Sequence, residues 1–184
     1  MSTDYLSEIP LDIRDRAARV KLLAIDVDGT LTDGQLWYTP EGEQFKGFNV
    51  LDGFGMKALR EQGIEVALIT TRESLVVAAR ARELGLRHVF QGATDKLHSL
   101  THLLHALTVV PSEVAFMGDD LPDLPVLTRV GLSLAPADAH PWVRSRVHWC
   151  TRSVGGHGAV REACDLILSA QGLAERVLHR FLPE

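Results

Sequence analysis

The sequence predicts an α/β fold in which helices cover both faces of a doubly wound, Rossmann-like parallel sheet. Short apolar runs alternate along the chain with segments of helical periodicity, which is typical of strand–helix–strand units. Several runs are apolar at consecutive positions, as expected for strands that are buried on both faces. The chain has 184 residues, and at about 150 residues per domain this length predicts one compact domain.

Six strands are expected from the apolar runs, at 20–25, 64–69, 88–90, 113–117, 131–135 and 147–150. Helices are expected between and after them, near 53–62, 73–85, 95–108, 120–129 and 158–171. Right-handed connections would place these helices on the two faces of the sheet.

One segment, 29–49, interrupts this alternation. It is rich in Thr, Trp, Tyr and Phe and has turn signals at Asp33-Gly34 and Pro40-Glu41-Gly42, so it is predicted to be a β-hairpin that projects after the first strand. An isolated two-stranded hairpin is only marginally stable, so we expect it to pack on something, such as another subunit.

The two ends of the chain are expected to lie outside the α/β domain. The domain is predicted to span 20–172, preceded by an N-terminal arm or short helix over 1–19. The tail, 173–184, has an amphipathic helical pattern.

Composition narrows the class of protein. Hydrophobic residues make up 46% and charged residues 23%, which argues against disorder, and no apolar run reaches the 18 residues of a spanning helix. The net charge of -5 disfavours nucleic-acid and anionic-membrane partners. Residues 1–16 lack a secretory signal pattern and the two cysteines form no disulfide framework, so a cytoplasmic location is expected.

The motif Asp26-Val27-Asp28-Gly29-Thr30 follows the first apolar run directly. Ligands of open α/β sheets bind beyond the carboxyl ends of the strands, so both carboxylates can serve one site there. The alternative for a lone motif of this kind is a pair of acids that opens a turn.

A second acidic cluster, Gly118-Asp119-Asp120-Leu121-Pro122-Asp123, follows the apolar run that ends at Met117. Three acids at a strand end repel one another unless a cation lies among them, and Mg²⁺ prefers carboxylate oxygens. Capping of the following helix by Asp119 or Asp120 is the alternative. Two such clusters, each after a buried strand, favour the metal site.

Lys96 occupies the first turn of the helix expected at 95–108, on the same side as the leucines of its core face. A cation there opposes the helix dipole, and an inward-facing lysine needs an anionic partner. The alternative is a lysine that extends to solvent from a frayed helix end.

Thr70 lies at the end of another apolar run, followed by Thr71 and Arg72. A hydroxyl at a strand end beside a helix start can bind a phosphate oxygen, whereas the alternative is a helix N-cap. Arg72 and Arg80 can add recognition of carboxylate or phosphate. The histidines of the helix at 95–108 lie opposite its leucines, which favours a solvated face over a metal site: His98, His102 and His105.

These motifs, in this order along the chain, resemble those of the haloacid dehalogenase superfamily of phosphatases. Longer stretches, including GLSLAPADAHPWV and GGHGAVREACDLIL, resemble the 3-deoxy-D-manno-octulosonate 8-phosphate phosphatase family. The resemblance covers roughly 20–172 and implies a core without a large cap domain, a homotetramer in which the hairpin packs between subunits, and a tail that reaches a neighbouring active site.

The resemblance also implies a role for each motif residue. Asp26 would be the nucleophile and form an aspartyl-phosphate, and Asp28 would protonate the leaving sugar oxygen and then activate water. Mg²⁺ would be held by Asp26, the backbone carbonyl of Asp28, and Asp119. Thr70 and Lys96 would hold the transferring phosphoryl group.

Substrate contacts are implied for a further set of positions, beside Asp28 and Lys96: Asn49, Val50, Asp52, Gly53, Lys57, Arg72 and Arg80. The chain departs from the family pattern at four positions, where Leu51, Lys57, Thr71 and His157 stand for the usual Arg, Arg, Gly and Arg. The phosphatase chemistry does not depend on these four, but the sugar specificity does.

The expected activity is Mg²⁺-dependent hydrolysis of a keto-deoxy sugar acid phosphate, first of all the eight-carbon acid, with a role in lipopolysaccharide biosynthesis. Alternatives are a nine-carbon, sialic-acid-type phosphate or a broad range of sugar phosphates. Different classes are a phospho-receiver module, which the order of the acidic motifs disfavours, and a non-catalytic assembly protein, which the presence of both Asp26 and Asp28 disfavours.

Overall fold

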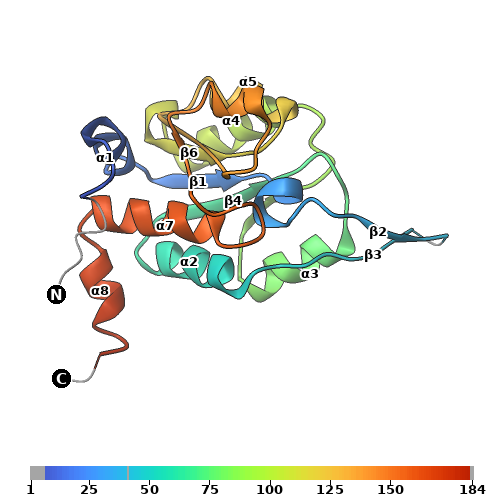
Figure 1. Ribbon diagram of the computed structural model, residues 1–184, viewed down its shortest axis with the longest axis horizontal. Helices are drawn as coiled ribbons and strands as arrows, with labels where there is room; N and C mark the ends of the chain where they lie inside the picture. Colours follow the sequence, from blue (N-terminus) through green and yellow to red (C-terminus); the bar gives the residue numbers. More distant parts are fainter. Residues whose placement is uncertain (1–6, 41, 183–184) are drawn as a thin grey trace.

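A parallel sheet of six strands forms the centre of the molecule, in the order β5-β4-β1-β6-β7-β8 (Figure 1). The computed structural model describes residues 7–40 and 42–182. All neighbouring strands of this sheet pair in parallel. The strands confirm the predicted runs: β1 (Leu22–Ile25), β4 (Glu65–Ile69), β5 (His88–Phe90), β6 (Val114–Met117), β7 (Leu132–Ala135) and β8 (Trp149–Cys150).

Helices cover both faces of the sheet, so the predicted fold class is confirmed (Figure 1). On one face lie α4 (Lys96–Leu107), α5 (Leu124–Leu127) and α6 (Pro141–Arg144). On the other lie α1 (Leu11–Ala17), α2 (Val50–Glu61), α3 (Leu75–Glu83), α7 (Ala159–Ala170) and α8 (Ala174–Leu178).

The central strand β1 shows why consecutive apolar residues are needed. Leu23 and Ile25 pack into the core beneath α2 and α7, whereas Leu22 and Ala24 pack into the core beneath α4. All four are completely buried. Burying a side chain the size of leucine stabilises the fold by about 1.5–3 kcal/mol, so both layers hold β1 in place.

The predicted helix at 120–129 is divided. A 3₁₀ turn, η3 (Leu121–Asp123), precedes the short α5, and another 3₁₀ turn, η2 (Pro111–Glu113), precedes β6. Pro122 and Pro125 explain the division, because proline lacks the N–H that a continuous helix would use.

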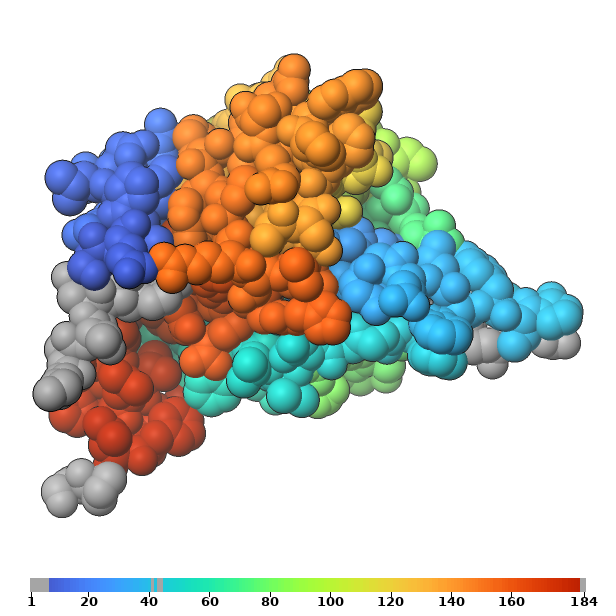
Figure 2. All heavy atoms as spheres, in the orientation of Figure 1, coloured from blue at the N-terminus to red at the C-terminus, as the bar shows by residue number. Residues whose placement is uncertain are grey.

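The hairpin is present but shorter than the predicted 29–49. It consists of β2 (Trp37–Thr39) and β3 (Gly42–Phe45) and projects from the body of the molecule (Figures 1 and 2). The preceding residues instead form a turn, η1 (Val27–Leu31), which is closed by the N–H of Thr32 donating to the carbonyl of Val27 at 3.0 Å. On the hairpin, the rings of Trp37 and Phe45 stack with centroids 5.1 Å apart.

Both ends of the described chain contain the short helices that the sequence suggested. In α1, Ile13 and Ala17 are buried against the core, so this part of the expected arm is packed; residues 1–6 lie outside the described part. In the tail, α8 is followed by Phe181, whose ring lies 5.6 Å from that of Phe54 on α2. Within residues 7–40 and 42–182, no helix combines the length and the apolar character needed to cross a membrane.

Candidate active site

The candidate site lies where the two central strands β1 and β6 end. Ile25 pairs with Met117 at the end of both strands, and Asp26 follows immediately, its N–H donating to the carbonyl of Met117 at 2.9 Å. Asp119 follows β6 after a single glycine. The parallel register therefore brings the two acidic motifs, which lie far apart in the sequence, to one edge of the sheet.

Lys96, the first residue of α4, brings a positive charge to these two acidic motifs. Its Nζ donates to Oδ1 of Asp26 and to Oδ1 of Asp123, in both cases at 2.6 Å. Only 5% of Lys96 is exposed. The prediction of an inward-facing lysine with an anionic partner is confirmed, and the alternative of a lysine extended to solvent is wrong.

Three carboxylates gather around this point. Asp26, Asp119 and Asp123 each offer an oxygen, and these oxygens lie within 4.8 Å of one another. Lys96 supplies one positive charge against the three carboxylates, so the cluster is short of positive charge. A divalent cation fits this need, and hard carboxylate oxygens suit Mg²⁺.

The oxygens of Asp123 are already engaged. Its Oδ1 accepts from Lys96, and its Oδ2 accepts from the N–H groups of Asp119 at 3.0 Å and Asp120 at 3.3 Å. Asp123 therefore orients Lys96 and Asp119, a role that the sequence did not reveal. Asp119 accepts from the Thr30 hydroxyl through Oδ1 at 3.0 Å and keeps Oδ2 for another ligand.

The titration of the cluster reflects burial and crowding. Burial, helped by the Asp123 carboxylate, raises the pKa of Asp26 to about 8 even though Lys96 acts in the opposite direction. Burial and Asp123 likewise raise the pKa of Asp119 to about 6. Burial alone would lower the pKa of Lys96, but Asp26 and Asp123 outweigh it and the pKa is raised. One lysine shared by several carboxylates stays charged without neutralising all of them, which again favours a bound cation.

Glycine is required where the turn η1 meets Asp119. Gly29 has φ +88°, and a Cβ there would lie 2.2 Å from Oδ2 of Asp119. A second glycine, Gly155 in the stretch before α7, passes so close that its Cβ would lie 1.9 Å from the carbonyl oxygen of Gly29. These contacts explain why glycines stand at both positions, since any side chain would displace the metal-site carboxylate or the turn.

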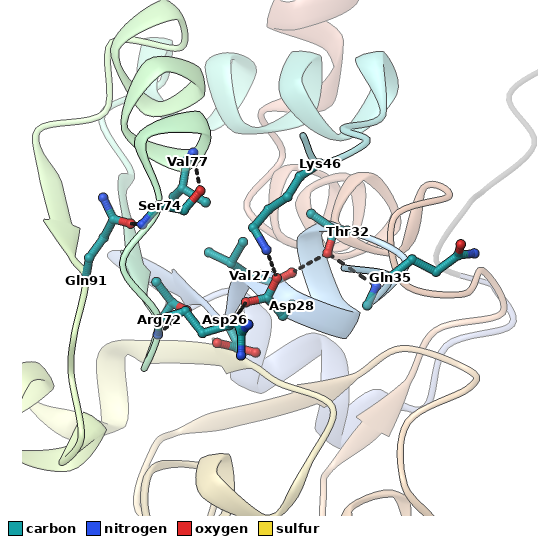
Figure 3. A network of polar contacts seen from close by, with 12 residues as sticks. Asp26, Val27, Asp28, Thr32, Gln35, Lys46, Arg72, Ser74, Val77 and Gln91 are labelled. Atoms are coloured by element: carbon teal, nitrogen blue, oxygen red, sulfur yellow. Dashed lines mark hydrogen bonds and ion pairs between the residues drawn. The ribbon is translucent and has the colours of Figure 1, made fainter. Parts of the chain in front are cut away.

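The carboxylate of Asp28 faces two cations, Lys46 after the hairpin and Arg72 after β4 (Figure 3). Lys46 Nζ donates to Oδ1 of Asp28 at 2.5 Å, and Nε of Arg72 lies 3.8 Å from Oδ2. Arg72 also donates to the Tyr38 hydroxyl on the hairpin. The sequence analysis missed Lys46. The neighbouring aromatic residues Phe45 and Phe48 are its only distinguishing feature in the sequence, and they do not indicate a partner.

Thr70 lies at the end of β4, beside β1, as expected. It is 1% exposed, and its hydroxyl accepts from the N–H of Arg72 at 3.3 Å. The alternative of an N-cap is wrong, because Ser74 caps α3 and accepts from the N–H of Val77. The contact of Thr70 with a phosphoryl group stays a prediction.

Several of the expected substrate contacts line the start of α2. Asn49 caps this helix by accepting from the N–H of Leu51 at 2.8 Å, and the next residue, Val50, is highly exposed. Lys57 is exposed about two turns further on. These positions are open to a ligand, but their substrate contacts stay predictions.

Arg80 reaches α2 from α3 across Gly53. Its Nη2 lies 3.4 Å from the carbonyl of Asn49 and would lie 2.4 Å from a Cβ at Gly53. Its Nε is buried and has no hydrogen-bond partner among the residues that the structure describes. A buried N–H without a partner is costly, but Nη1 of Arg80 already donates to Glu83 at 2.8 Å, so contact between this arginine and a substrate anion stays a prediction.

Asp52 departs from the expected role of a substrate contact. Its side chain is completely buried, and its carboxylate accepts from the N–H groups of Gly158 at 3.3 Å and Arg161 at 2.7 Å, at the start of α7. Burial raises the pKa of Asp52 although these N–H groups act in the opposite direction. The geometry makes Asp52 an anchor between α2 and α7 and does not favour direct contact with a substrate.

The histidines of α4 point to solvent. His98, His102 and His105 are all exposed, as predicted for a solvated face. Among residues 7–40 and 42–182, the candidate metal cluster is formed by carboxylates alone.

Comparison with known proteins gives consistent matches. Residues 82–162 match the family of haloacid dehalogenase-like hydrolases. The curated 3-deoxy-D-manno-octulosonate 8-phosphate phosphatase of Yersinia pestis is 48% identical over 164 residues, which are 89% of this chain and 88% of the relative.

Solved structures of similar sequence have the same fold as this chain. A hypothetical protein from Xanthomonas campestris is 51% identical, with a TM-score of 0.96 and 100% of both chains covered. The 3-deoxy-D-manno-octulosonate 8-phosphate phosphatase of Moraxella catarrhalis, solved with magnesium, phosphate and the sugar acid, is 42% identical, with a TM-score of 0.90 and coverage of 93% of this chain and 98% of that one. With this identity over nearly the whole chain, with both acidic motifs and Thr70 at the ends of the expected strands, and with Lys96 at the start of α4, the chain belongs to the 3-deoxy-D-manno-octulosonate 8-phosphate phosphatase family of haloacid dehalogenase-like hydrolases.

Proposed function

We propose that this protein hydrolyses 3-deoxy-D-manno-octulosonate 8-phosphate to the free sugar acid and inorganic phosphate. The observation that carries the proposal is the buried carboxylate of Asp26, held 2.6 Å from Lys96 at the end of β1 with Asp119 and Asp123 beside it. The Moraxella catarrhalis relative, solved with magnesium, phosphate and the sugar acid, supports the substrate class.

The first step forms an aspartyl-phosphate on Asp26. An oxygen of the Asp26 carboxylate attacks phosphorus in line with the ester bond, which breaks and leaves its electron pair on the sugar oxygen. Asp28 donates a proton to that oxygen, so the sugar departs as an alcohol. Lys96 offsets negative charge on Asp26 and on the phosphoryl oxygens, and the Thr70 hydroxyl holds one of these oxygens.

The second step regenerates the enzyme. Asp28, now a carboxylate, takes a proton from water, and the resulting hydroxide attacks phosphorus and releases phosphate from Asp26. Mg²⁺, held by Asp26, Asp119 and the backbone carbonyl of Asp28, would supply positive charge beside the phosphoryl group.

Recognition of the sugar acid is assigned to the cations around α2. Arg72 lies beside Asp28, and the buried Nε of Arg80 needs an acceptor, so these two arginines are suited to the substrate carboxylate. Leu51 stands where the family has arginine, and its apolar side chain has no donor, so it cannot serve as an anion partner. Lys57 replaces a second arginine as a point charge without its two-pronged geometry.

The test is a comparison of kcat/KM with purified protein and Mg²⁺. The eight-carbon acid phosphate is expected to exceed both a nine-carbon acid phosphate and a simple sugar phosphate. Higher values for the nine-carbon acid, or equal values for all three, would favour the alternative specificities. No turnover of any ester would favour the receiver or assembly alternatives.

We also propose a homotetramer in which the hairpin contacts neighbouring subunits. The hairpin carries exposed apolar and aromatic side chains that a single chain leaves in solvent: Leu36, Trp37, Tyr38 and Phe45. Sedimentation velocity tests this, with a four-chain species expected for the wild type and a monomer contradicting it. The cytoplasmic location stays a prediction.

A further inference from the structure

Lys46 is a buried cation outside the recognised motifs. Its side chain has no exposed surface, whereas lysine is almost never fully buried without a charged partner. One charged partner is Asp28, which receives a hydrogen bond from Nζ at 2.5 Å (Figure 3). Burying a lysine is costly, so its placement beside the expected proton donor requires an explanation.

The contact gives the two oxygens of the Asp28 carboxylate different surroundings. Oδ1 is taken by Lys46, and Oδ2 lies 3.8 Å from Nε of Arg72, beyond hydrogen-bond distance. Among the contacts of the described residues, Oδ2 is therefore the oxygen left for a ligand. Asp28 keeps about a fifth of its side chain exposed, so this oxygen can reach a ligand.

Lys46 also connects Asp28 to the hairpin. It follows β3 directly, and the opposite strand β2 carries Tyr38, whose hydroxyl accepts from Arg72. The two cations around Asp28 are therefore both tied to the hairpin, one through the chain and one through a side chain. The hairpin contributes to the site although it contains none of the sequence motifs.

We propose that Lys46 is a positioning residue that orients Asp28 for proton transfer to the leaving sugar oxygen. This inference rests on the proposed function, in which Asp28 is the proton donor. Lys46 itself donates no proton to the substrate. Its effect should therefore depend on how much the leaving group needs a proton.

The experiment compares two esters in single turnover with Lys46→Met. An alkyl phosphate, such as the eight-carbon acid phosphate, leaves as a poor alkoxide, whereas p-nitrophenyl phosphate leaves as a stable phenolate. General acid catalysis contributes about 10²–10⁴-fold, so we expect the first-step rate to fall by about tenfold or more for the alkyl ester. The rate of p-nitrophenolate formation should change by less than about threefold, because this leaving group does not need the acid.

A double-mutant comparison tests whether Lys46 acts through Asp28. Adding Lys46→Met to Asp28→Asn should cause no further loss on the alkyl ester, since the acid is already absent. Equal losses on both esters, a further loss in the double variant, or no loss at all would each overturn the inference.

Controls separate this role from folding. Lys21→Met removes a lysine whose partner is Glu113, far along β1 from the site, and should leave both rates unchanged. Inhibition by inorganic phosphate should be unaltered in Lys46→Met. If Lys46→Met does not fold, Lys46→Gln keeps a donor, and its first-step rate on the alkyl ester should lie between those of the wild type and Asp28→Asn.

The wild-type protein distinguishes the failure of this inference from the failure of the proposed function. If it hydrolyses another alkyl ester but not the eight-carbon acid phosphate, only the proposed substrate is rejected. If it hydrolyses no ester, both proposals are rejected.

Discussion

The carboxylate of Asp26 is subject to opposing influences. Burial and the neighbouring carboxylate of Asp123 raise its pKa, whereas Lys96 stabilises its charged form. A nucleophile must be ionised, so the residue needs more positive charge than Lys96 provides. At this scale the sequence motif identifies the residue, but its pKa depends on neighbours from two other segments, the one that holds Asp119 and Asp123 and the one that holds Lys96.

Replacement of Asp26 by asparagine tests the nucleophile. Asp26→Asn keeps the size of the side chain and removes a buried carboxyl group whose charged form is disfavoured by burial and by Asp123, so the metal-free protein should unfold at the same or a higher temperature. Turnover should fall by a factor on the order of 10⁴ or more, as for the loss of other nucleophiles. Phosphate release and thermal unfolding measure the two effects, and near-wild-type turnover would contradict the assignment.

Among the elements, the turn η1 does the most to shape the site. It takes the chain from β1 past Asp28 and, through Gly29, passes within contact distance of Asp119. The hairpin then returns with Lys46 to Asp28. The site is thus built by one strand end, one turn and one hairpin, completed by the starts of η3 and α4.

A matched pair of glycine variants tests this turn. Gly29 and Gly63 both have left-handed backbones, with φ +88° and +84°, but a Cβ at Gly63 meets nothing within 4 Å. Alanine at either position should cost about 1–2 kcal/mol of stability from backbone strain. Only Gly29→Ala should also weaken Mg²⁺ binding, because its Cβ displaces Asp119.

Titration of Mg²⁺ into both variants by calorimetry, with unfolding curves for each, would measure the difference. Equal Mg²⁺ affinity in Gly29→Ala and Gly63→Ala would show that the contact between Gly29 and Asp119 is not important for the metal site.

For the whole molecule, the parallel sheet fixes which strand ends meet. β1 lies between β4 and β6, so the residues that follow these three strands, including Asp26, Thr70 and Asp119, reach the same edge. The resulting excess of carboxylates makes the stability of the protein depend on both pH and metal.

The sign of this dependence follows from the raised pKa values. Between the ordinary carboxyl value of 3.8 and about 8, the folded metal-free protein holds a proton on Asp26 that the unfolded chain releases. Raising the pH through this window therefore lowers the free energy of unfolding. Mg²⁺ must displace such protons, so its affinity should rise by about tenfold or more from pH 6 to pH 8.

Calorimetric titration at the two pH values, with unfolding temperatures measured with and without Mg²⁺, checks this expectation. The Mg²⁺-induced rise in unfolding temperature should be larger at pH 8. Asp26→Asn should flatten the pH dependence, and an affinity that does not change with pH in the wild type would contradict the argument.

The sequence by itself determined the fold class, the strands, the two acidic motifs and the inward direction of Lys96. These follow from short-range rules: apolar runs mark buried strands, helical periodicity places Lys96 on the core side, and parallel strands end at a common edge. Two elements differ from the prediction. The hairpin is shorter because the turn η1 takes up its first residues, and the helix at 120–129 is divided by its prolines.

Only the tertiary structure decided which polar groups pair. Lys46 meets Asp28 across 18 positions, Asp123 joins Lys96 across 27, and Asp52 turns from an expected substrate contact into the anchor of α7 across more than 100. No local pattern encodes these partners, because each depends on where turns and helices carry the backbone. Burial then makes the pairings obligatory, since a charge removed from water must find a partner within reach.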